Sequence, residues 1–122
     1  MVTSAASILV VEDDPDVGML LEHVLASAGY SVDRVTTASE SRHLIALKNY
    51  DLVLADGVLP DGTGIEIADQ ATARGMKVLI VTGYALPLAQ VGVLGRHDYV
   101  LKPIRPGALI NMVAEYVGRP SA

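Results

Sequence analysis

Short apolar runs and amphipathic segments alternate along this chain, and the alternation limits the folds open to it. The runs are rich in branched side chains, which predicts buried strands. They cover residues 8–11, 31–36, 52–55, 77–81 and 98–101. Segments of helical character follow at residues 15–28, 38–48, 64–74, 84–95 and from 106 onward. Nearly all-apolar strands are typical of a parallel sheet covered on both faces. The pattern therefore predicts a three-layer, doubly wound α/β fold.

The helical segments differ in how clearly they are marked. Asp14 and Pro15 predict the start of the first helix, and Gly29 predicts its end. Its apolar residues recur at helical spacing: Val17, Leu20, Leu21, Val24, Leu25 and Ala28. The fourth segment is expected to be short or irregular, because it is interrupted at Pro87, Gly92 and Gly95. The second strand is expected at an edge of the sheet, because Asp33 and Arg34 lie within it.

Length and charge narrow the class of protein. The 122 residues contain no linker or repeat, so we expect a single domain over 1–122 with a core of about 7–118. A net charge of −5, without a cluster of basic residues, argues against a nucleic-acid surface. The absence of cysteine excludes disulfides and thiolate metal sites. No signal peptide and no apolar run of about 18 residues is present, so we expect a cytoplasmic protein without membrane contact.

Polar residues stand where the predicted strands end. Glu12 and Asp13 follow the first strand, and Asp56, Thr82 and Lys102 follow the third, fourth and fifth. Because the carboxyl ends of parallel strands meet at one edge, where ligands bind in such sheets, these groups are expected to form one site. Clustered carboxylates require a hard cation, and Mg²⁺ suits a site with few protein oxygens. A nearby amine and hydroxyl suit the oxygens of a phosphoryl group.

Four segments that carry these residues resemble the receiver domain of two-component response regulators. They are ILVVEDDP, DLVLADGVLPDGTG, VLIVTG and YVLKP, in the order of that family, and the likeness covers about residues 7–118. The resemblance implies a flavodoxin-like sheet of five parallel strands in the order 2-1-3-4-5, with about five helices. It also implies a cis peptide bond before Pro103 and a stand-alone, non-enzymatic signalling switch that catalyses only its own phosphorylation and dephosphorylation.

The resemblance assigns a role to each residue at the strand ends. Asp56 is the expected phosphoacceptor, taking its phosphoryl group from a phosphohistidine of a sensor histidine kinase or phosphotransfer protein. The expected Mg²⁺ ligands are Glu12, Asp13, Asp56 and the backbone carbonyl of Val58. Thr82 matches the switch hydroxyl with Gly83 leaving room beside it, Lys102 matches the amine that pairs with the phosphoryl group, and Tyr99 matches the aromatic switch. The modified domain is expected to dock a downstream protein partner.

Other interpretations stay open at this point. Lys102 could be a solvated lysine, Thr82 a turn hydroxyl and Tyr99 a core ring. A haloacid-dehalogenase-like phosphatase also uses an aspartate at a strand end, but it needs a second acid where this chain has Val58. A flavodoxin-like FMN carrier would need a phosphate loop where the chain has Glu12, Asp13 and Asp14. The domain could also dock without phosphorylation, or derive from a larger hybrid kinase. The histidines His23, His43 and His97 receive no role.

Overall fold

A five-stranded parallel sheet forms the centre of the molecule. The structure is a computed structural model that describes residues 5–83 and 97–118. The strands lie in the order β2-β1-β3-β6-β7, which confirms the predicted order 2-1-3-4-5 for the strands of this sheet. Their bounds are β1 Ser7–Val11, β2 Ser31–Val35, β3 Leu52–Asp56, β6 Lys77–Thr82 and β7 Asp98–Leu101. β2 is an edge strand, as its polar sequence predicted.

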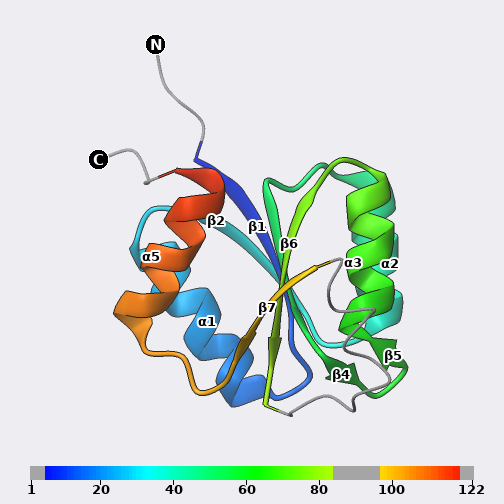
Figure 1. Ribbon diagram of the computed structural model, residues 1–122, viewed down its shortest axis with the longest axis horizontal. Coiled ribbons are helices and arrows are strands. Elements are labelled where there is room, and N and C mark those ends of the chain that lie inside the picture. The colour runs from blue at the N-terminus through cyan, green and yellow to red at the C-terminus, as the bar shows by residue number, and fades with distance from the viewer. Residues whose placement is uncertain (1–4, 84–96, 119–122) are drawn as a thin grey trace.

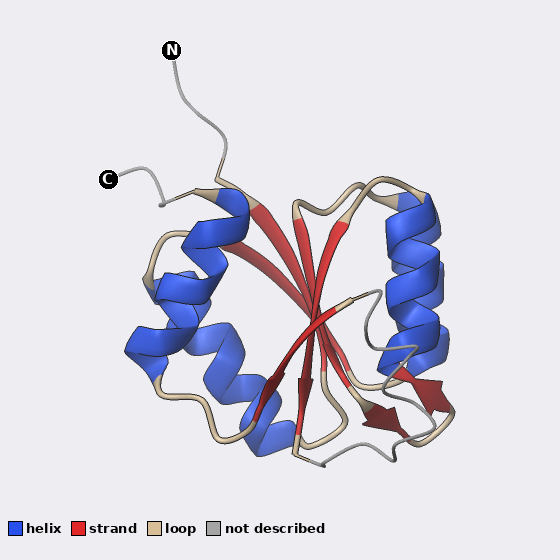
Figure 2. Ribbon diagram, viewed as in Figure 1, coloured by secondary structure: helices blue, strands red, loops and turns tan. Residues whose placement is uncertain are grey.

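Helices cover both faces of the sheet and complete the three layers (Figures 1 and 2). α1 and α5 lie together on one face, and α2 and α3 lie together on the other. Their bounds are α1 Pro15–Ser27, α2 Ala38–Leu47, α3 Gly64–Ala73 and α5 Pro106–Val117. The irregular helix expected over residues 84–95 lies outside the described residues. None of the described helices has the length and apolar character needed to cross a bilayer.

Alternate residues of the central strands fill two separate cores. In β3, Val53 and Ala55 pack beneath α2 and α3, whereas Leu52 and Leu54 pack beneath α1 and α5. β1 divides in the same way, and all of these side chains are at most 1% exposed. Because both faces are covered, every position of β1 except its first and every position of β3 except its last is buried. This explains why these strands appear in the sequence as unbroken apolar runs.

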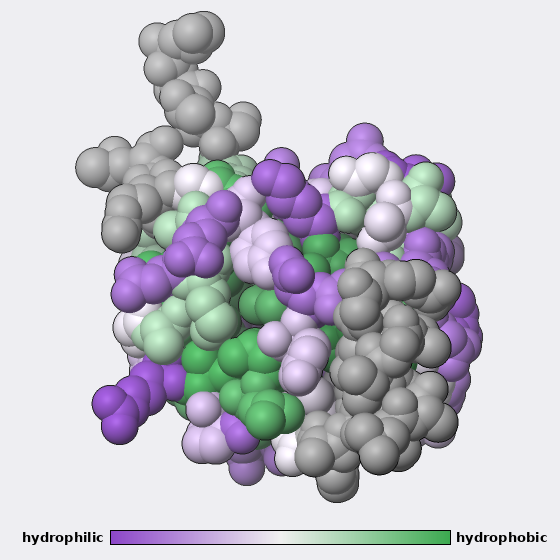
Figure 3. Space-filling view, in the orientation of Figure 1, coloured by the Kyte–Doolittle hydropathy of each residue, from purple (hydrophilic) through white to green (hydrophobic). Residues whose placement is uncertain are grey.

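β7 departs from the expectation of burial on both faces. Asp98, Tyr99 and Leu101 are exposed, and Val100 is half-buried. β7 is the edge strand next to β6, and among the described residues no strand pairs with its other side. An apolar area is consequently exposed over β7 and α5, as Figure 3 shows.

A short antiparallel hairpin follows β3 and was not predicted as strand. β4 Val58–Leu59 pairs with β5 Gly62–Thr63, and a turn at Pro60 and Asp61 joins them. Leu59 is buried and belongs to the core beneath α2 and α3. The hairpin therefore starts two residues after Asp56 and is anchored to the helical layer.

Local hydrogen bonds explain where several elements begin and end. The Asp14 carboxylate accepts hydrogen bonds from the backbone N–H groups of Asp16 and Val17, which confirms its predicted role as the cap of α1. Gly29 has a φ of 105°, a conformation that suits glycine, and lies just beyond the end of α1. Next to Gly29, the hydroxyl of Tyr30 donates to the carbonyl of Gly118 at 2.9 Å. Both ends of the described chain thus lie at the amino-terminal edge of the sheet (Figure 1).

The polar residue Asp33 of β2 is the acceptor in a surface hydrogen-bond network. Its carboxylate accepts hydrogen bonds from the Tyr50 hydroxyl at 2.7 Å and from Lys48 Nζ at 2.9 Å. The bond from Tyr50, followed by that from Lys48, lowers the pKa of Asp33. A group whose pKa is lower in the folded state stabilises the fold fully above its unfolded pKa, about 4. That stabilisation is lost as the pH falls through the folded value.

Tyr50→Phe is therefore expected to lower the free energy of unfolding in a pH-dependent way. We expect a loss of about 1 kcal/mol at pH 7, the typical net contribution of a hydrogen bond partly screened by solvent. The loss should begin to shrink below about pH 4, where Asp33 of the unfolded chain becomes protonated, and should be smallest below the lowered pKa of Asp33 in the folded chain. Urea unfolding at pH 7 and at pH 3.5 measures both values. Tyr30→Phe is the control, because its hydroxyl donates to an uncharged carbonyl. A Tyr50→Phe effect as independent of pH as that of Tyr30→Phe would contradict the prediction.

Candidate functional site

The register of the parallel strands brings the predicted site residues to one edge. Val11 pairs with Ala55, so Glu12 and Asp56 leave neighbouring strands at the same level. Asp56 pairs with Val81, and Thr82 pairs with Leu101, the residue before Lys102. An open depression of about 500 Å³ lies at this edge. It is lined by Glu12, Asp13, Asp14, Val17, Asp56, Val58, Gly83 and Lys102.

Three carboxylates gather in this depression. Glu12, Asp13 and Asp56 each offer an oxygen, and these oxygens all lie within 4.8 Å of one another. Glu12 is 1% exposed, and within the described residues its Oε2 atom has no hydrogen-bond partner. A buried carboxylate oxygen without a partner is costly unless a further group satisfies it. The oxygen donors and the unpartnered Oε2 fit a hard divalent cation such as Mg²⁺.

Lys102 supplies positive charge to the same site. Its Nζ donates hydrogen bonds to Glu12 Oε1 and, at 3.4 Å, to Asp56 Oδ2. Burial opposes the charge on the ammonium, but the bond to Glu12 and the negative charge of Asp56 outweigh burial, so the pKa of Lys102 is raised. One ammonium faces three acidic groups, so the site retains an excess of acidic side chains.

The environments of Glu12 and Asp56 move their pKa values in opposite directions. Burial, and next the hydrogen bond with Asp56, raise the pKa of Glu12 to about 7. Burial acts in the same direction on Asp56, but the hydrogen bond with Glu12, the charge of Lys102 and the bond from the Val58 N–H together lower its pKa. Asp56 is therefore the carboxylate kept ionised, as a nucleophile requires.

The backbone around Asp56 is held in place by two close glycine contacts. A Cβ atom on Gly64 would lie 2.4 Å from the carbonyl oxygen of Asp56, and one on Gly57 would lie 2.7 Å from Thr82 Oγ1. Gly64 N–H also donates to the Gly57 carbonyl at 3.1 Å. The absence of a side chain at Gly57 thus leaves space beside Thr82. The sequence resemblance assigned such a role to Gly83, which stays a prediction, and sequence reasoning had not singled out Gly57.

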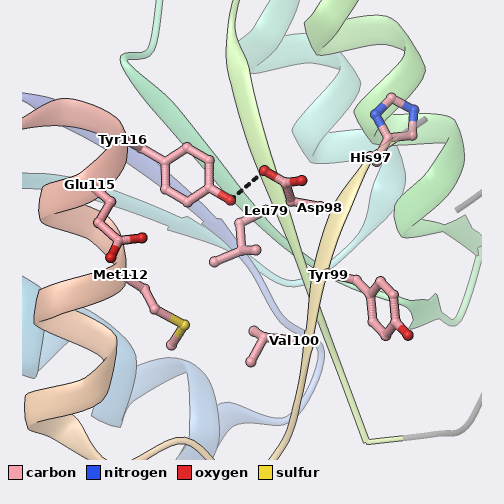
Figure 4. A pocket seen from close by; sticks show the side chains of 8 residues that line it. All are labelled: Leu79, His97, Asp98, Tyr99, Val100, Met112, Glu115 and Tyr116. Atoms are coloured by element: carbon pink, nitrogen blue, oxygen red, sulfur yellow. Dashed lines mark hydrogen bonds between the residues drawn. The ribbon is translucent and has the colours of Figure 1, made fainter. Parts of the chain in front are cut away.

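Tyr99 is not among the residues that line the depression with the carboxylates. It is 53% exposed and projects to the side of β7 opposite α5 (Figure 4). On the α5 side, an open pocket of about 470 Å³ lies between β7 and α5, and the hydroxyl of Tyr116 donates to Asp98 Oδ2 there at 2.6 Å. The Lys102–Pro103 peptide bond is cis, as the resemblance implied. Asp14 caps α1, and it is not one of the three clustered carboxylates.

A comparison with protein families decides the class of this site. The family described as "Response regulator receiver domain" matches residues 8–114. The chain belongs to the response regulator receiver domain family. Receiver domains of two-component response regulators are phosphorylation-dependent switches, and the strand-end site lies where this fold binds ligands.

Curated relatives of this receiver domain are longer response regulators. The chain is 35% identical over 116 residues to the probable transcriptional regulatory protein SilR of Salmonella typhimurium, covering 92% of this chain and 51% of that protein. It is 32% identical to the transcriptional regulatory protein CusR of Escherichia coli, covering 94% of this chain and 52% of CusR. The receiver domain thus spans about half the length of these relatives.

Solved receiver domains share the whole architecture. A CheY-like receiver domain protein from Methanospirillum hungatei has a TM-score of 0.87 at 32% identity, with 93% of this chain and 94% of that chain covered. The receiver domain of the sensor histidine kinase PA1611 from Pseudomonas aeruginosa has a TM-score of 0.83 at 26% identity, with 94% and 99% covered. That protein holds a magnesium ion coordinated in its active-site cleft.

Proposed function

We propose that this receiver domain accepts a phosphoryl group on Asp56 from a phosphohistidine of a sensor histidine kinase or a phosphotransfer protein. The observation that carries the proposal is the position of the Asp56 carboxylate, which lies among two further carboxylates and 3.4 Å from the Lys102 ammonium. Mg²⁺ would be held by the side chains of Glu12, Asp13 and Asp56 and by the carbonyl of Val58. When bound, the ion neutralises negative charge on the phosphoryl oxygens.

Each side chain of the site has a separate role in the phosphoryl transfer. An ionised Asp56 oxygen attacks phosphorus, a new O–P bond forms, and the N–P bond of the phosphohistidine breaks with its electron pair passing to the ring nitrogen. Lys102 pairs with a phosphoryl oxygen, and the Thr82 hydroxyl donates to another. Thr82 and Tyr99 would then change position, and the exposed face of β7 and α5 would dock a downstream protein partner.

Incubation with acetyl phosphate and Mg²⁺ tests the proposal directly. Intact mass spectrometry is expected to show the addition of a single phosphoryl group to the wild-type chain and none to Asp56→Asn. Asparagine keeps the shape of the side chain and removes the nucleophilic charge, so the variant is expected to keep its fold by circular dichroism. A wild-type chain that stays unmodified, or an Asp56→Asn chain modified to the same extent, would overturn the proposal.

The lifetime of the phosphorylated form is expected to be long. Val58 lies two residues after Asp56 and is 48% exposed, and its apolar side chain cannot orient an attacking water. Val58→Asn introduces an amide that can hydrogen-bond to that water, so we expect dephosphorylation on the order of tenfold faster. The decay of the phosphorylated mass after removal of acetyl phosphate measures the rate. Val58→Leu is the apolar control, and equal decay of both variants would refute the expectation.

A further inference from the structure

Asp61 links the hairpin after Asp56 to a helix far away in the sequence. Its Oδ1 accepts a hydrogen bond from the backbone N–H of Ala38 at 2.7 Å, and its Oδ2 accepts one from Ser39 at 3.0 Å. Ala38 is the first residue of α2 and is fully buried. The two bonds lower the pKa of Asp61, the bond from Ala38 having the larger effect. The tip of the hairpin is thus tied to the start of α2.

The start of α2 does not depend on Asp61 alone. Thr37 caps α2 through its own hydroxyl, which accepts from the N–H of Glu40 at 3.1 Å, and the Glu40 carboxylate accepts from the Thr36 and Thr37 hydroxyls in return. The bonds from Asp61 therefore add a tertiary connection to a helix that already has a local cap. This division permits the two roles to be separated by substitution.

The hairpin packs closely against α2, and its base is next to Asp56 in the sequence. A Cβ atom on Gly62 would lie 3.0 Å from that of Ala38, so the turn and the helix are in close contact. At its base, the hairpin is closed by the bond from Gly64 N–H to the Gly57 carbonyl. Val58 lies between these two fixed points and donates its N–H to Asp56 Oδ1 at 3.3 Å. A displacement at the tip would therefore reach Val58 and Asp56.

We propose that Asp61 is a positioning residue for the hairpin that contains Val58. Asp61 holds Val58 in place by tying this hairpin to the amino terminus of α2. The inference rests on the proposed function, since it concerns the Val58 carbonyl assigned there to Mg²⁺. By reciprocity, an ion or phosphoryl group bound at Asp56 strengthens the connection to α2, which makes the start of α2 responsive to the occupied site.

Asp61→Ala and Thr37→Ala form the matched pair that tests this role. Both remove a hydrogen-bond acceptor from the start of α2, but only Asp61→Ala releases the hairpin. Titration calorimetry with Mg²⁺ is expected to show an affinity about tenfold lower for Asp61→Ala, in the range found when a residue that orients a metal ligand is lost. Thr37→Ala is expected to stay within twofold of wild type. Asp61→Asn retains one acceptor oxygen and is expected to recover part of the loss.

Two further measurements separate positioning from a loss of structure. In the Mg²⁺-free proteins, the backbone amide resonances of Gly57 and Val58 should shift in Asp61→Ala and not in Thr37→Ala. With acetyl phosphate, Asp61→Ala should need about tenfold more Mg²⁺ for half-maximal rate and reach a maximal rate within about twofold of wild type. Equal Mg²⁺ affinities for Asp61→Ala and Thr37→Ala would overturn the inference. A wild-type chain that binds no Mg²⁺ would instead overturn the proposed function.

Discussion

Lys102→Met is expected to lower the rate of phosphorylation by acetyl phosphate about 100-fold, the usual effect of removing a single group that stabilises charge in a transition state. Lys102 Nζ lies 3.4 Å from Asp56 Oδ2, so it is placed to meet negative charge that develops on a phosphoryl group there. Methionine preserves the length and the apolar stem of the side chain, which lines a groove with Val17, Leu20 and Pro103. The change therefore removes charge with little loss of packing.

The effect of Lys102→Met on Mg²⁺ should go the other way. Removing an ammonium beside three carboxylates leaves more uncompensated negative charge, so calorimetry is expected to show Mg²⁺ affinity equal to or higher than that of wild type. Lys77→Met is the matched control. Lys77 is the first residue of β6, whereas Thr82 of the site is the last, and Lys77 Nζ donates a hydrogen bond to the Tyr116 carbonyl. If Lys102→Met and Lys77→Met are phosphorylated equally fast, Lys102 does not take part in the transfer.

Gly64→Ala is expected to lower the free energy of unfolding by about 3 kcal/mol, at the upper end of the usual cost of overpacking. The added Cβ would lie 2.4 Å from the Asp56 carbonyl oxygen and 3.2 Å from the Gly57 Cα atom. Both are backbone atoms, and Asp56 belongs to a central strand, so neither can move aside without disturbing the sheet. Urea unfolding followed by circular dichroism measures the change.

Gly107→Ala provides the comparison for Gly64→Ala. Gly107 also lies at the start of a helix, but a Cβ atom there would meet no atom of the described residues within 4 Å. Its φ is not positive, so alanine is expected to be neutral or to stabilise by up to about 1 kcal/mol. Any Gly64→Ala protein that folds should also be phosphorylated more slowly, because the clash displaces Asp56. Similar unfolding free energies for the two variants would show that the contact at Gly64 is not restrictive.

Features that depend on local spacing could be predicted from the sequence. Asp56 and Thr82 each end an apolar run, so the apolar run predicts both where the strand ends and which polar residue stands at its end. The alternation of strands and helices then indicated a parallel sheet, and a parallel sheet brings these ends to one edge. The cap at Asp14 followed from the same kind of local pattern.

Features that depend on tertiary contacts could not be predicted in this way. Asp61 accepts a hydrogen bond from Ala38, which is 23 positions away in the sequence. The residues next to either position do not indicate this contact. The restriction at Gly57 comes from Thr82 on a neighbouring strand, so the sequence shows only a glycine after an aspartate. The exposure of β7 reflects its position at the edge of the sheet, whereas its composition resembles that of a buried strand.

The hydrogen bond from Tyr30 to Gly118 has a practical consequence for experiments on this domain. It holds the carboxyl end of α5 beside the start of β2, and the first strand begins at the same edge. A fluorophore, affinity handle or fused protein attached close to Ser7 or Gly118 would lie on the side of the molecule that faces away from Asp56. Labelled proteins should therefore keep their acidic edge open to a phosphodonor, and surface-immobilised molecules should present that edge outward.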